Sequence, residues 1–158
     1  MLAACARDGD HAAILFLDLD NFKPLNDAHG HPVGDLLLIE VARRLTARLR
    51  GVDTASRFGG DEFVVLVSGL GRDPTLARAQ AAVVAEKLRA VLAEPYRLGV
   101  VRAGVGAVVE HRCTATVGVV VFSGDDNDPD ELVDRADAAM YQAKQAGRNT
   151  VHVEARAV

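Results

Sequence analysis

The chain has 158 residues, of which 49% are hydrophobic and 25% are charged, and this composition is typical of a soluble globular protein with one hydrophobic core. Its net charge of −4 disfavours a nonspecific nucleic-acid surface, and no apolar run or leader pattern predicts a membrane span or a secretory signal. Cys5 and Cys113 lack metal-type spacing, so we expect free thiols in a cytoplasmic protein.

The first part of the chain alternates between strand and helix patterns. An apolar run within residues 13–18 is typical of a strand buried on both faces, and a short helical stretch follows near 21–28. Apolar residues at helical spacing predict a helix over 33–50. Two strands, at 54–58 and 62–67, are then expected to form a hairpin around a pair of glycines.

A second long helix is predicted to begin at Asp73-Pro74, which is a typical helix start. Its apolar residues are expected to face the core, and they are Leu76, Ala79, Val83, Val84, Leu88 and Val91. The remaining patterns predict a small hairpin, a central strand, a third long helix and a last short strand, at residues 96–110, 114–122, 129–146 and 150–153. Strands and helices therefore alternate as in an α/β domain.

Acidic residues stand at the ends of two predicted strands. Asp18 and Asp20 end the first strand and share one face, because side chains alternate along a strand. The segment Gly59-Gly60-Asp61-Glu62 places two more carboxylates at the edge of the strand over 62–67. Buried carboxylates are costly unless a cation meets them, and Mg²⁺ prefers carboxylates together with substrate phosphates. The alternative is that these acids are ordinary turn formers after strands.

Five sequence blocks occur in the order that characterises one family. They are Asp18–Lys23, Asn26–His31, Gly34-Asp35, Arg57–Phe63 and Ala136–Asn149. On these blocks the chain resembles the GGDEF family of diguanylate cyclases over roughly residues 12–154. The resemblance implies an α/β (α+β) fold with a mostly antiparallel central sheet flanked by helices, similar to the palm of class III nucleotide cyclases and of many polymerases.

The resemblance also implies a reaction in which two GTP molecules are joined into cyclic di-GMP and two pyrophosphates are released. By resemblance, Asp18 and Asp61 are ligands of Mg²⁺ or Mn²⁺, and Leu19 contributes its backbone carbonyl. Glu62 supports a second metal ion or activates the attacking hydroxyl, and the sequence leaves open which acid acts as the base. Asp20 matches a motif position, although a structural role is equally compatible with its place.

Asn26 and Asp35 resemble the family's guanine readers. A carboxylate accepts hydrogen bonds from guanine N–H groups, and an amide pairs with both donors and acceptors. The alternatives are a turn residue for Asn26 and, for Asp35, an acid favoured at a helix N-terminus. Phe22 packs either under the nucleotide or in the core.

Three basic residues of the matching blocks are implied at the phosphates. Lys23, which we also count with the catalytic residues, reaches them from the first block. Lys144 and Arg148 lie four residues apart on one helix face, where the alternative is complementarity to the helix dipole. Gly59 and Gly60 allow a tight turn and the close approach of a phosphate.

Five residues separate Arg50-Gly51-Val52-Asp53 from Gly59, and this is the spacing at which the family carries a product-inhibition site. The resemblance implies that Arg50 and Asp53 hold a guanine edge and a phosphate of bound cyclic di-GMP. Arginine suits this task because its planar fork pairs with phosphate or with a purine edge. The alternative is a solvated helix end followed by a turn-forming acid.

The chain lacks the opening segment of the family, Asp-x-Leu-Thr-Gly-Leu-x-Asn-Arg, and only residues 2–7 match the end of the helix that follows it. We therefore expect a single domain over residues 1–158 that looks truncated at its N-terminus. An upstream sensor domain is expected in the full-length protein.

The leading hypothesis is a cytoplasmic cyclase that works as a homodimer, because one active site holds one GTP. Its partners are the GTP substrate and cyclic di-GMP as product and inhibitor, with no nucleic acid and no membrane contact by this chain. The alternative is a catalytically silent regulatory module that binds GTP or cyclic di-GMP.

Overall fold

A computed structural model describes residues 9–102, 104–124 and 128–155. The helix end expected at residues 2–7 lies outside this part of the chain. Within the described ranges, no helix combines the length and the apolar character that crossing a bilayer requires.

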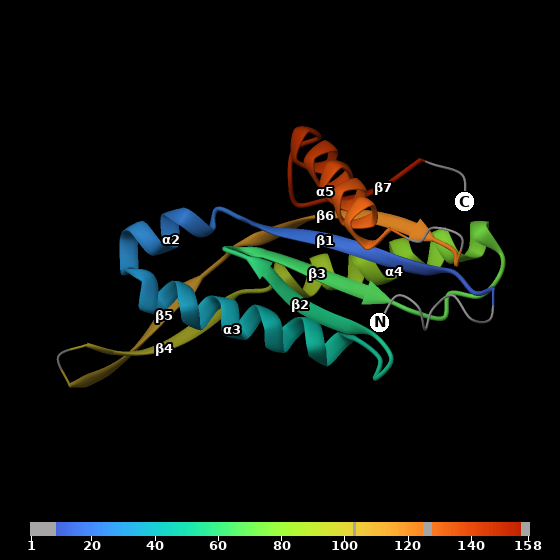
Figure 1. Ribbon diagram of the computed structural model, residues 1–158. Helices are drawn as coiled ribbons and strands as arrows, with labels where there is room; N and C mark the ends of the chain where they lie inside the picture. The colour runs from blue at the N-terminus through green and yellow to red at the C-terminus, as the bar shows by residue number, and fades with distance from the viewer. Residues whose placement is uncertain (1–8, 103, 125–127, 156–158) are drawn as a thin grey trace.

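A five-stranded sheet with the order β2-β3-β1-β6-β7 forms the centre of the fold (Figure 1). The middle strand β1 (Ala12–Asp20) runs antiparallel to β3 (Glu62–Val67) on one side and to β6 (Thr114–Phe122) on the other. The outer strand β2 (Thr54–Gly59) is antiparallel to β3, whereas β7 (Val151–Val153) is parallel to β6. The predicted, mostly antiparallel sheet is confirmed.

Helices cover both faces of this sheet. The alternation of side chains in β1 sends one set of apolar residues toward α3 (His31–Arg48) and α4 (Pro74–Leu92), and the other set toward α5 (Pro129–Gln145). The short helix α2 (Phe22–His29) connects the end of β1 to α3. The functional residues at the end of β1 therefore lie where α2 begins and where α5 crosses the sheet.

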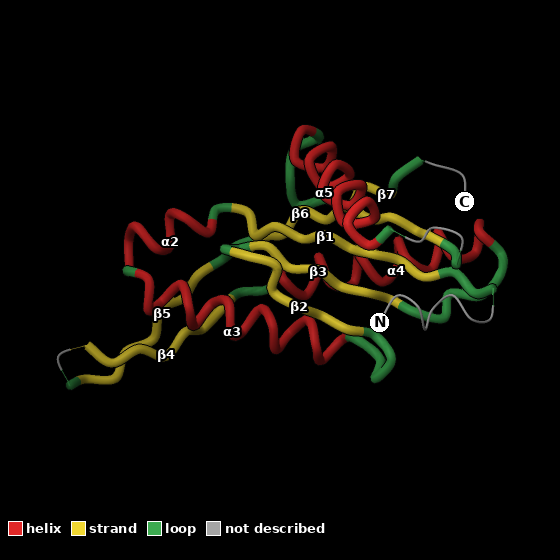
Figure 2. The backbone as a smooth tube through the Cα atoms, in the orientation of Figure 1, coloured by secondary structure: helices red, strands yellow, loops and turns green. Residues whose placement is uncertain are grey.

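The predicted small hairpin is also present. Its strands β4 (Tyr96–Arg102) and β5 (Val105–His111) form a separate two-stranded sheet that extends away from the central one, beside α3 (Figure 2). Tyr96 anchors its base in the core, while Val101 and Val108 on the outward face are exposed.

The inward face of α4 differs from the prediction. Leu76, Ala79 and Val83 are predicted to face the core, but all three are exposed, Leu76 by 59% and Val83 by 53%. The helix instead presents mainly small residues to the core, and they are Ala77, Ala81 and Ala85, followed by Leu88, Val91 and Leu92. Alanine lets a helix backbone approach its neighbour closely, so packing distance, rather than hydrophobicity alone, selected this face.

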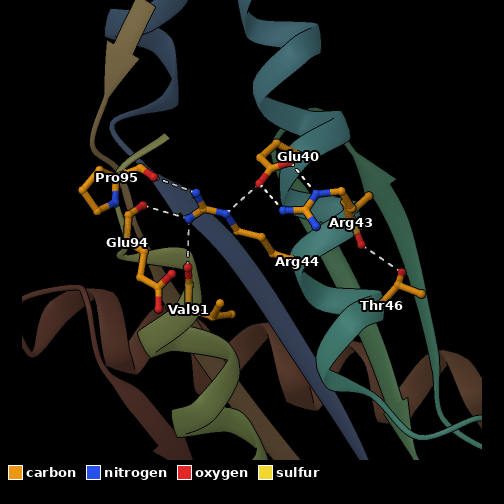
Figure 3. Close-up of polar contacts among 8 residues, drawn as sticks. Glu40, Arg43, Arg44, Thr46, Val91, Glu94 and Pro95 are labelled. Atoms are coloured by element: carbon orange, nitrogen blue, oxygen red, sulfur yellow. Dashed lines mark hydrogen bonds and ion pairs between the residues drawn. The ribbon is translucent and has the colours of Figure 1, made fainter. Parts of the chain in front are cut away.

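Arg44 joins α3 to the end of α4 (Figure 3). Its guanidinium donates to the backbone carbonyls of Val91, Glu94 and Pro95 over 2.9, 2.8 and 2.7 Å. The same group lies 3.8 Å from the centre of the Tyr96 ring. The Val91 carbonyl belongs to the last turn of α4, where carbonyls lack partners within the helix, and those of Glu94 and Pro95 follow the helix. The Arg44 side chain, which is only 10% exposed, satisfies all three.

Candidate active site

Two acidic segments meet because of the register between β1 and β3. Asp18 of β1 lies directly opposite Glu62 of β3 in the antiparallel pair. The N–H of Leu19 donates to the carbonyl of Asp61 over 3.2 Å. The end of the first strand and the glycine turn are thereby held together, as the sequence predicted for a carboxylate site.

The turn that carries Asp61 is fixed by its backbone. Gly60 has φ of 50°, a left-handed conformation that glycine adopts without a steric penalty. The β2–β3 register shifts between Arg57 and Gly59. Arg57 Nε donates to the carbonyl of Gly60 over 2.9 Å and so closes the turn.

Seven of the fourteen site residues predicted from the sequence line one pocket of about 340 Å³, and they are Asp18, Leu19, Phe22, Lys23, Asp61, Lys144 and Arg148. Its acids come from the ends of β1 and of the glycine turn, and its cations come from α2 and from the end of α5. Lys144 Nζ lies 2.9 Å from Asp18 Oδ2. The pocket therefore combines carboxylates and cations, as the binding of a metal-bound polyphosphate requires.

The carboxylates of the pocket carry perturbed pKa values. Burial raises the pKa of Asp18, although the hydrogen bond and charge of Lys144 act in the opposite direction. Burial also raises the pKa of Glu62, and the charges of Asp18, Asp137 and Asp61 raise it further. Like charges so close together favour the binding of a cation.

The oxygen atoms of the pocket suit the metal ion that the family resemblance implies. Among the described residues, no three His, Cys, Asp or Glu side chains form a self-contained metal cage. Mg²⁺ does not need one, because it is usually held by one or two carboxylates together with substrate phosphates and water. Asp18 and Asp61, with the carbonyl of Leu19, offer only oxygen ligands and fit such an ion.

The predicted guanine readers lie beside this pocket, on α2 and α3. Asn26 Oδ1 is buried and has no hydrogen-bond partner within the described part of the chain. A Cβ atom on Gly34 would come within 1.9 Å of that oxygen and 3.2 Å of the Phe22 ring, so glycine makes room for the amide. Asp35 lines a second pocket of about 550 Å³ between α3 and β2. The unpaired acceptor of Asn26 could receive a hydrogen bond from a ligand.

Comparison with known proteins decides the family. The sequence profile described as "Diguanylate cyclase, GGDEF domain" matches residues 1–150. The chain belongs to the GGDEF domain family. The family and the fold class predicted from the sequence are both confirmed.

Individual relatives agree with this assignment. This GGDEF domain is 47% identical over 143 residues to the bifunctional diguanylate cyclase/cyclic di-GMP phosphodiesterase MucR of Pseudomonas aeruginosa, and the match covers 90% of the chain and 19% of MucR. It is 38% identical to the response regulator PleD of Caulobacter vibrioides, over 90% of the chain and 29% of PleD. The chain thus spans less than a third of the length of these curated relatives. The crystal structure of the GGDEF domain of YfiN from P. aeruginosa matches with a TM-score of 0.82 at 32% identity, covering 99% of this chain and 89% of that one.

The Arg-x-x-Asp element of the GGDEF domain lies between α3 and β2, at the opposite end of α3 from Asp35. The Asp53 side chain, which is 3% exposed, accepts hydrogen bonds from Arg50 Nε over 3.1 Å and from the Ser68 N–H over 3.2 Å. Burial alone would raise the pKa of Asp53, but the hydrogen bonds from Arg50 and Ser68 lower it overall. Asp53 therefore holds the turn, while the Arg50 side chain is 56% exposed.

Sequence reasoning assigned no role to Thr114, Thr116 or Asn149, yet the structure brings all three to Asp20. The Asp20 carboxylate is buried and accepts hydrogen bonds from both hydroxyls and from the Asn149 N–H. These contacts favour the structural role that the sequence left open for Asp20. The spacing of Thr114 and Thr116, two residues apart and so on one face of β6, was the only sequence signal for these contacts. Asn149 lies 129 residues from Asp20, so no local pattern connects the two.

Proposed function

We propose that this GGDEF domain condenses two GTP molecules into cyclic di-GMP and releases two pyrophosphates. One observation carries the proposal, namely a single pocket in which carboxylates from two strand ends face cationic side chains. The acids are Asp18 and Asp61, and the cations are Lys23, Lys144 and Arg148. Phosphoryl transfer requires mainly positioning and charge neutralisation, which these two sets of side chains are suited to provide.

Asp18, Asp61 and the Leu19 carbonyl would hold Mg²⁺ or Mn²⁺, and Glu62 would support a second ion or accept the proton of the attacking hydroxyl. When bound, the cation neutralises charge that develops on the transferred phosphoryl group. The raised pKa of Glu62 brings this carboxylate closer to the value at which a general base works near neutral pH. Because Asp18 is assigned to the metal ion, we assign this proton transfer from the 3′-hydroxyl to Glu62.

Asn26 and Asp35 would read the guanine base. The Asn26 Oδ1 acceptor is already desolvated and without a partner among the described residues, so a guanine N–H group can pair with it at little further cost. The Asp35 carboxylate can accept from the remaining N–H donors on the same edge of the base. Phe22, whose ring lies beside Gly34, would support the base from below.

Lys23, Lys144 and Arg148 would bind the phosphates. Lys144 pairs with Asp18, and its flexible four-carbon side chain lets Nζ turn toward the terminal phosphates when GTP enters. Arg148 can bind phosphate oxygens with two parallel hydrogen bonds. Gly59 and Gly60 have no side chain that would obstruct a phosphate at the turn.

The catalytic unit is proposed to be a homodimer, because each pocket accommodates one nucleotide and the reaction joins two. The two chains would meet face to face, so that each 3′-hydroxyl attacks the α-phosphate of the other GTP. Specific activity should then rise with enzyme concentration. A strictly proportional increase in rate across a wide dilution series would contradict transient dimerisation.

The proposed substrate is an intracellular nucleotide, and we therefore place the domain in the cytoplasm. PleD is named a response regulator and is much longer than the matched region. We infer by analogy that an upstream sensor domain controls this GGDEF domain in the full-length protein.

Arg50 and Asp53 are proposed to bind cyclic di-GMP as a product inhibitor. The exposed guanidinium of Arg50 can meet a phosphate or a guanine edge while Asp53 keeps the turn in place. Arg50→Ala should raise the final yield of product, and Arg48→Ala, a matched change of the exposed arginine that ends α3 two residues earlier, should not. Equal inhibition of the parent and the Arg50 variant by added cyclic di-GMP would exclude this site.

Incubation with GTP and Mg²⁺, followed by chromatography of the products, tests the activity. The parent chain should form cyclic di-GMP and Asp61→Asn should not, whereas Asp134→Asn, which changes an exposed carboxylate on α5, should keep the activity. GTP or cyclic di-GMP binding without turnover by the parent would instead identify a regulatory module.

A further inference from the structure

Asp20 uses both carboxylate oxygens inside the protein. The residue is only 3% exposed. Oδ1 accepts from Thr116 Oγ1 over 2.7 Å, and Oδ2 accepts from Thr114 Oγ1 over 2.6 Å. Oδ2 also accepts from the backbone N–H of Asn149 over 3.1 Å. Asp20 lines the pocket, but with three donors bound its carboxylate is engaged in holding protein groups.

The segment that Asp20 holds has an unusual backbone. It follows α5, and Gly147, Arg148 and Asn149 have φ of 121°, 62° and 45°. Left-handed conformations are unfavourable for residues other than glycine and persist only where the surroundings fix them. Two consecutive non-glycine residues in this conformation therefore require external support.

That support comes from both sides of the segment. Asp20 binds the Asn149 N–H from β1, and the Thr116 hydroxyl contacts the same N–H at 3.2 Å. Arg89 of α4 donates to the Asn149 side chain. Immediately afterwards, the Thr150 carbonyl accepts from the Val117 N–H over 2.9 Å, where the chain joins β6.

Arg148 lies one residue before the anchored N–H and lines the pocket with Lys144 and Asp18. The direction of its side chain depends on its backbone conformation, which this anchor maintains together with the hydrogen bond from the Arg148 N–H to the Ala143 carbonyl over 3.3 Å. Asp20 also stands two residues after Asp18 on the same face of β1. It thus links the acidic side of the pocket, on β1, to the cationic side, at the end of α5.

We propose that Asp20 is a positioning residue that holds Arg148 in place for a nucleotide phosphate through the N–H of Asn149. The inference rests on the proposed function, since it assigns the phosphate to Arg148. It predicts that loss of the Asp20 carboxylate weakens the binding of the phosphates and spares the binding of the base. The base is assigned to residues of α2 and α3, which are not among the hydrogen-bond partners of Asp20 given above.

The test is a double-mutant cycle on ligand binding, measured by calorimetry in the presence of Mg²⁺. The ligands are 3′-deoxy-GTP, which lacks the attacking hydroxyl, and 3′-deoxyguanosine, which also lacks the phosphates. Asp20→Asn should weaken 3′-deoxy-GTP about tenfold and 3′-deoxyguanosine less than about twofold. In an Arg148→Ala background, Asp20→Asn should cause no further loss, because both changes remove the same contact.

Two further variants separate this role from a general effect on folding. Asp128→Asn is the matched control, because Asp128 caps the other end of α5 and asparagine is an equally good cap. It should bind both ligands like the parent. Thr116→Val removes the hydroxyl that binds Asp20 and contacts the Asn149 N–H, and it should reproduce the phosphate-specific loss even if Asp20→Asn fails to fold.

The possible outcomes distinguish the inference from the proposed function. Additive effects of Asp20→Asn and Arg148→Ala, or an equal loss of both ligands, would overturn the positioning role alone. If Asp20→Asn does not fold, unchanged binding of 3′-deoxy-GTP by Thr116→Val would do the same. Failure of the parent chain to bind 3′-deoxy-GTP would overturn the proposed function, and the inference with it.

Discussion

Gly118 of β6 marks the place where α5 comes closest to the sheet. A Cβ atom at this position would lie 2.2 Å from the carbonyl oxygen of Ala136 and 2.2 Å from the backbone nitrogen of Met140. Ordinary contact begins at 3.4 Å, so α5 would have to move by 3.4 − 2.2, or about 1.2 Å. Both contacts are with backbone atoms, and no change of rotamer can relieve them. Gly118→Ala is therefore expected to displace α5.

Two effects of this change can be given magnitudes. Overpacking a core costs about 1–3 kcal/mol, and a clash with backbone belongs at the upper end, near about 3 kcal/mol. Since a domain is stable by only about 5–15 kcal/mol, the loss is large. The displaced helix also carries Lys144, whose Nζ is 2.9 Å from Asp18. A misplacement of about 1 Å at an active site can lower the rate about a hundredfold.

Urea unfolding and cyclic di-GMP formation measure the two effects separately. Gly99→Ala is the matched control, because Gly99 is also a strand glycine but an added Cβ there meets nothing within 4 Å. The control should be as stable and as active as the parent. If Gly118→Ala matched the control in both assays, the close contact between α5 and β6 would have no part in stability or in the site.

Three further outcomes are expected. Glu62→Gln should raise the urea midpoint of the metal-free protein at pH 7, because the raised pKa of Glu62 means that folding disfavours its ionised form. In unfolding titrations, the higher stability of the variant should vanish as the pH falls below the ordinary pKa of 4.5. Gly34→Ala should weaken GTP binding in calorimetry while the melting temperature stays nearly constant, because the new methyl group meets a side-chain amide rather than backbone. Arg44→Ala should cost about 2–3 kcal/mol in urea unfolding through three orphaned carbonyls, whereas Arg43→Ala, which removes a partner of Glu40 on the surface, should change little.

The strands could be predicted closely because their apolar runs are bounded by polar residues. The strand expected over 114–122 has those bounds in the structure, and the strand expected over 13–18 lies within β1. The buried face of α4 could not be predicted in the same way. Hydrophobicity ranks Leu76 above Ala77, but the distance between the helix and the sheet selects the smaller side chain.

The candidate site also has parts that the sequence could predict and parts that it could not. The motif blocks predicted residues that line the pocket, because their chemistry is local to short segments such as Asp18-Leu19. The link from Asp20 to Asn149 depends on the register of β1 against β6 and on the path of the chain after α5. Neither is encoded in a short periodic pattern, so this contact emerged only in three dimensions.

Condensation of two GTP molecules is tested most directly by isotope mixing. The parent chain, with Mg²⁺, receives equal amounts of ordinary GTP and GTP with a ¹⁵N-labelled base, and the products are weighed by mass spectrometry beside those of Asp61→Asn. The parent should form cyclic di-GMP in which the species with one labelled and one ordinary guanine is the most abundant, and the variant should form none. A parent that binds GTP but yields no product with two guanines would contradict the proposed cyclase activity.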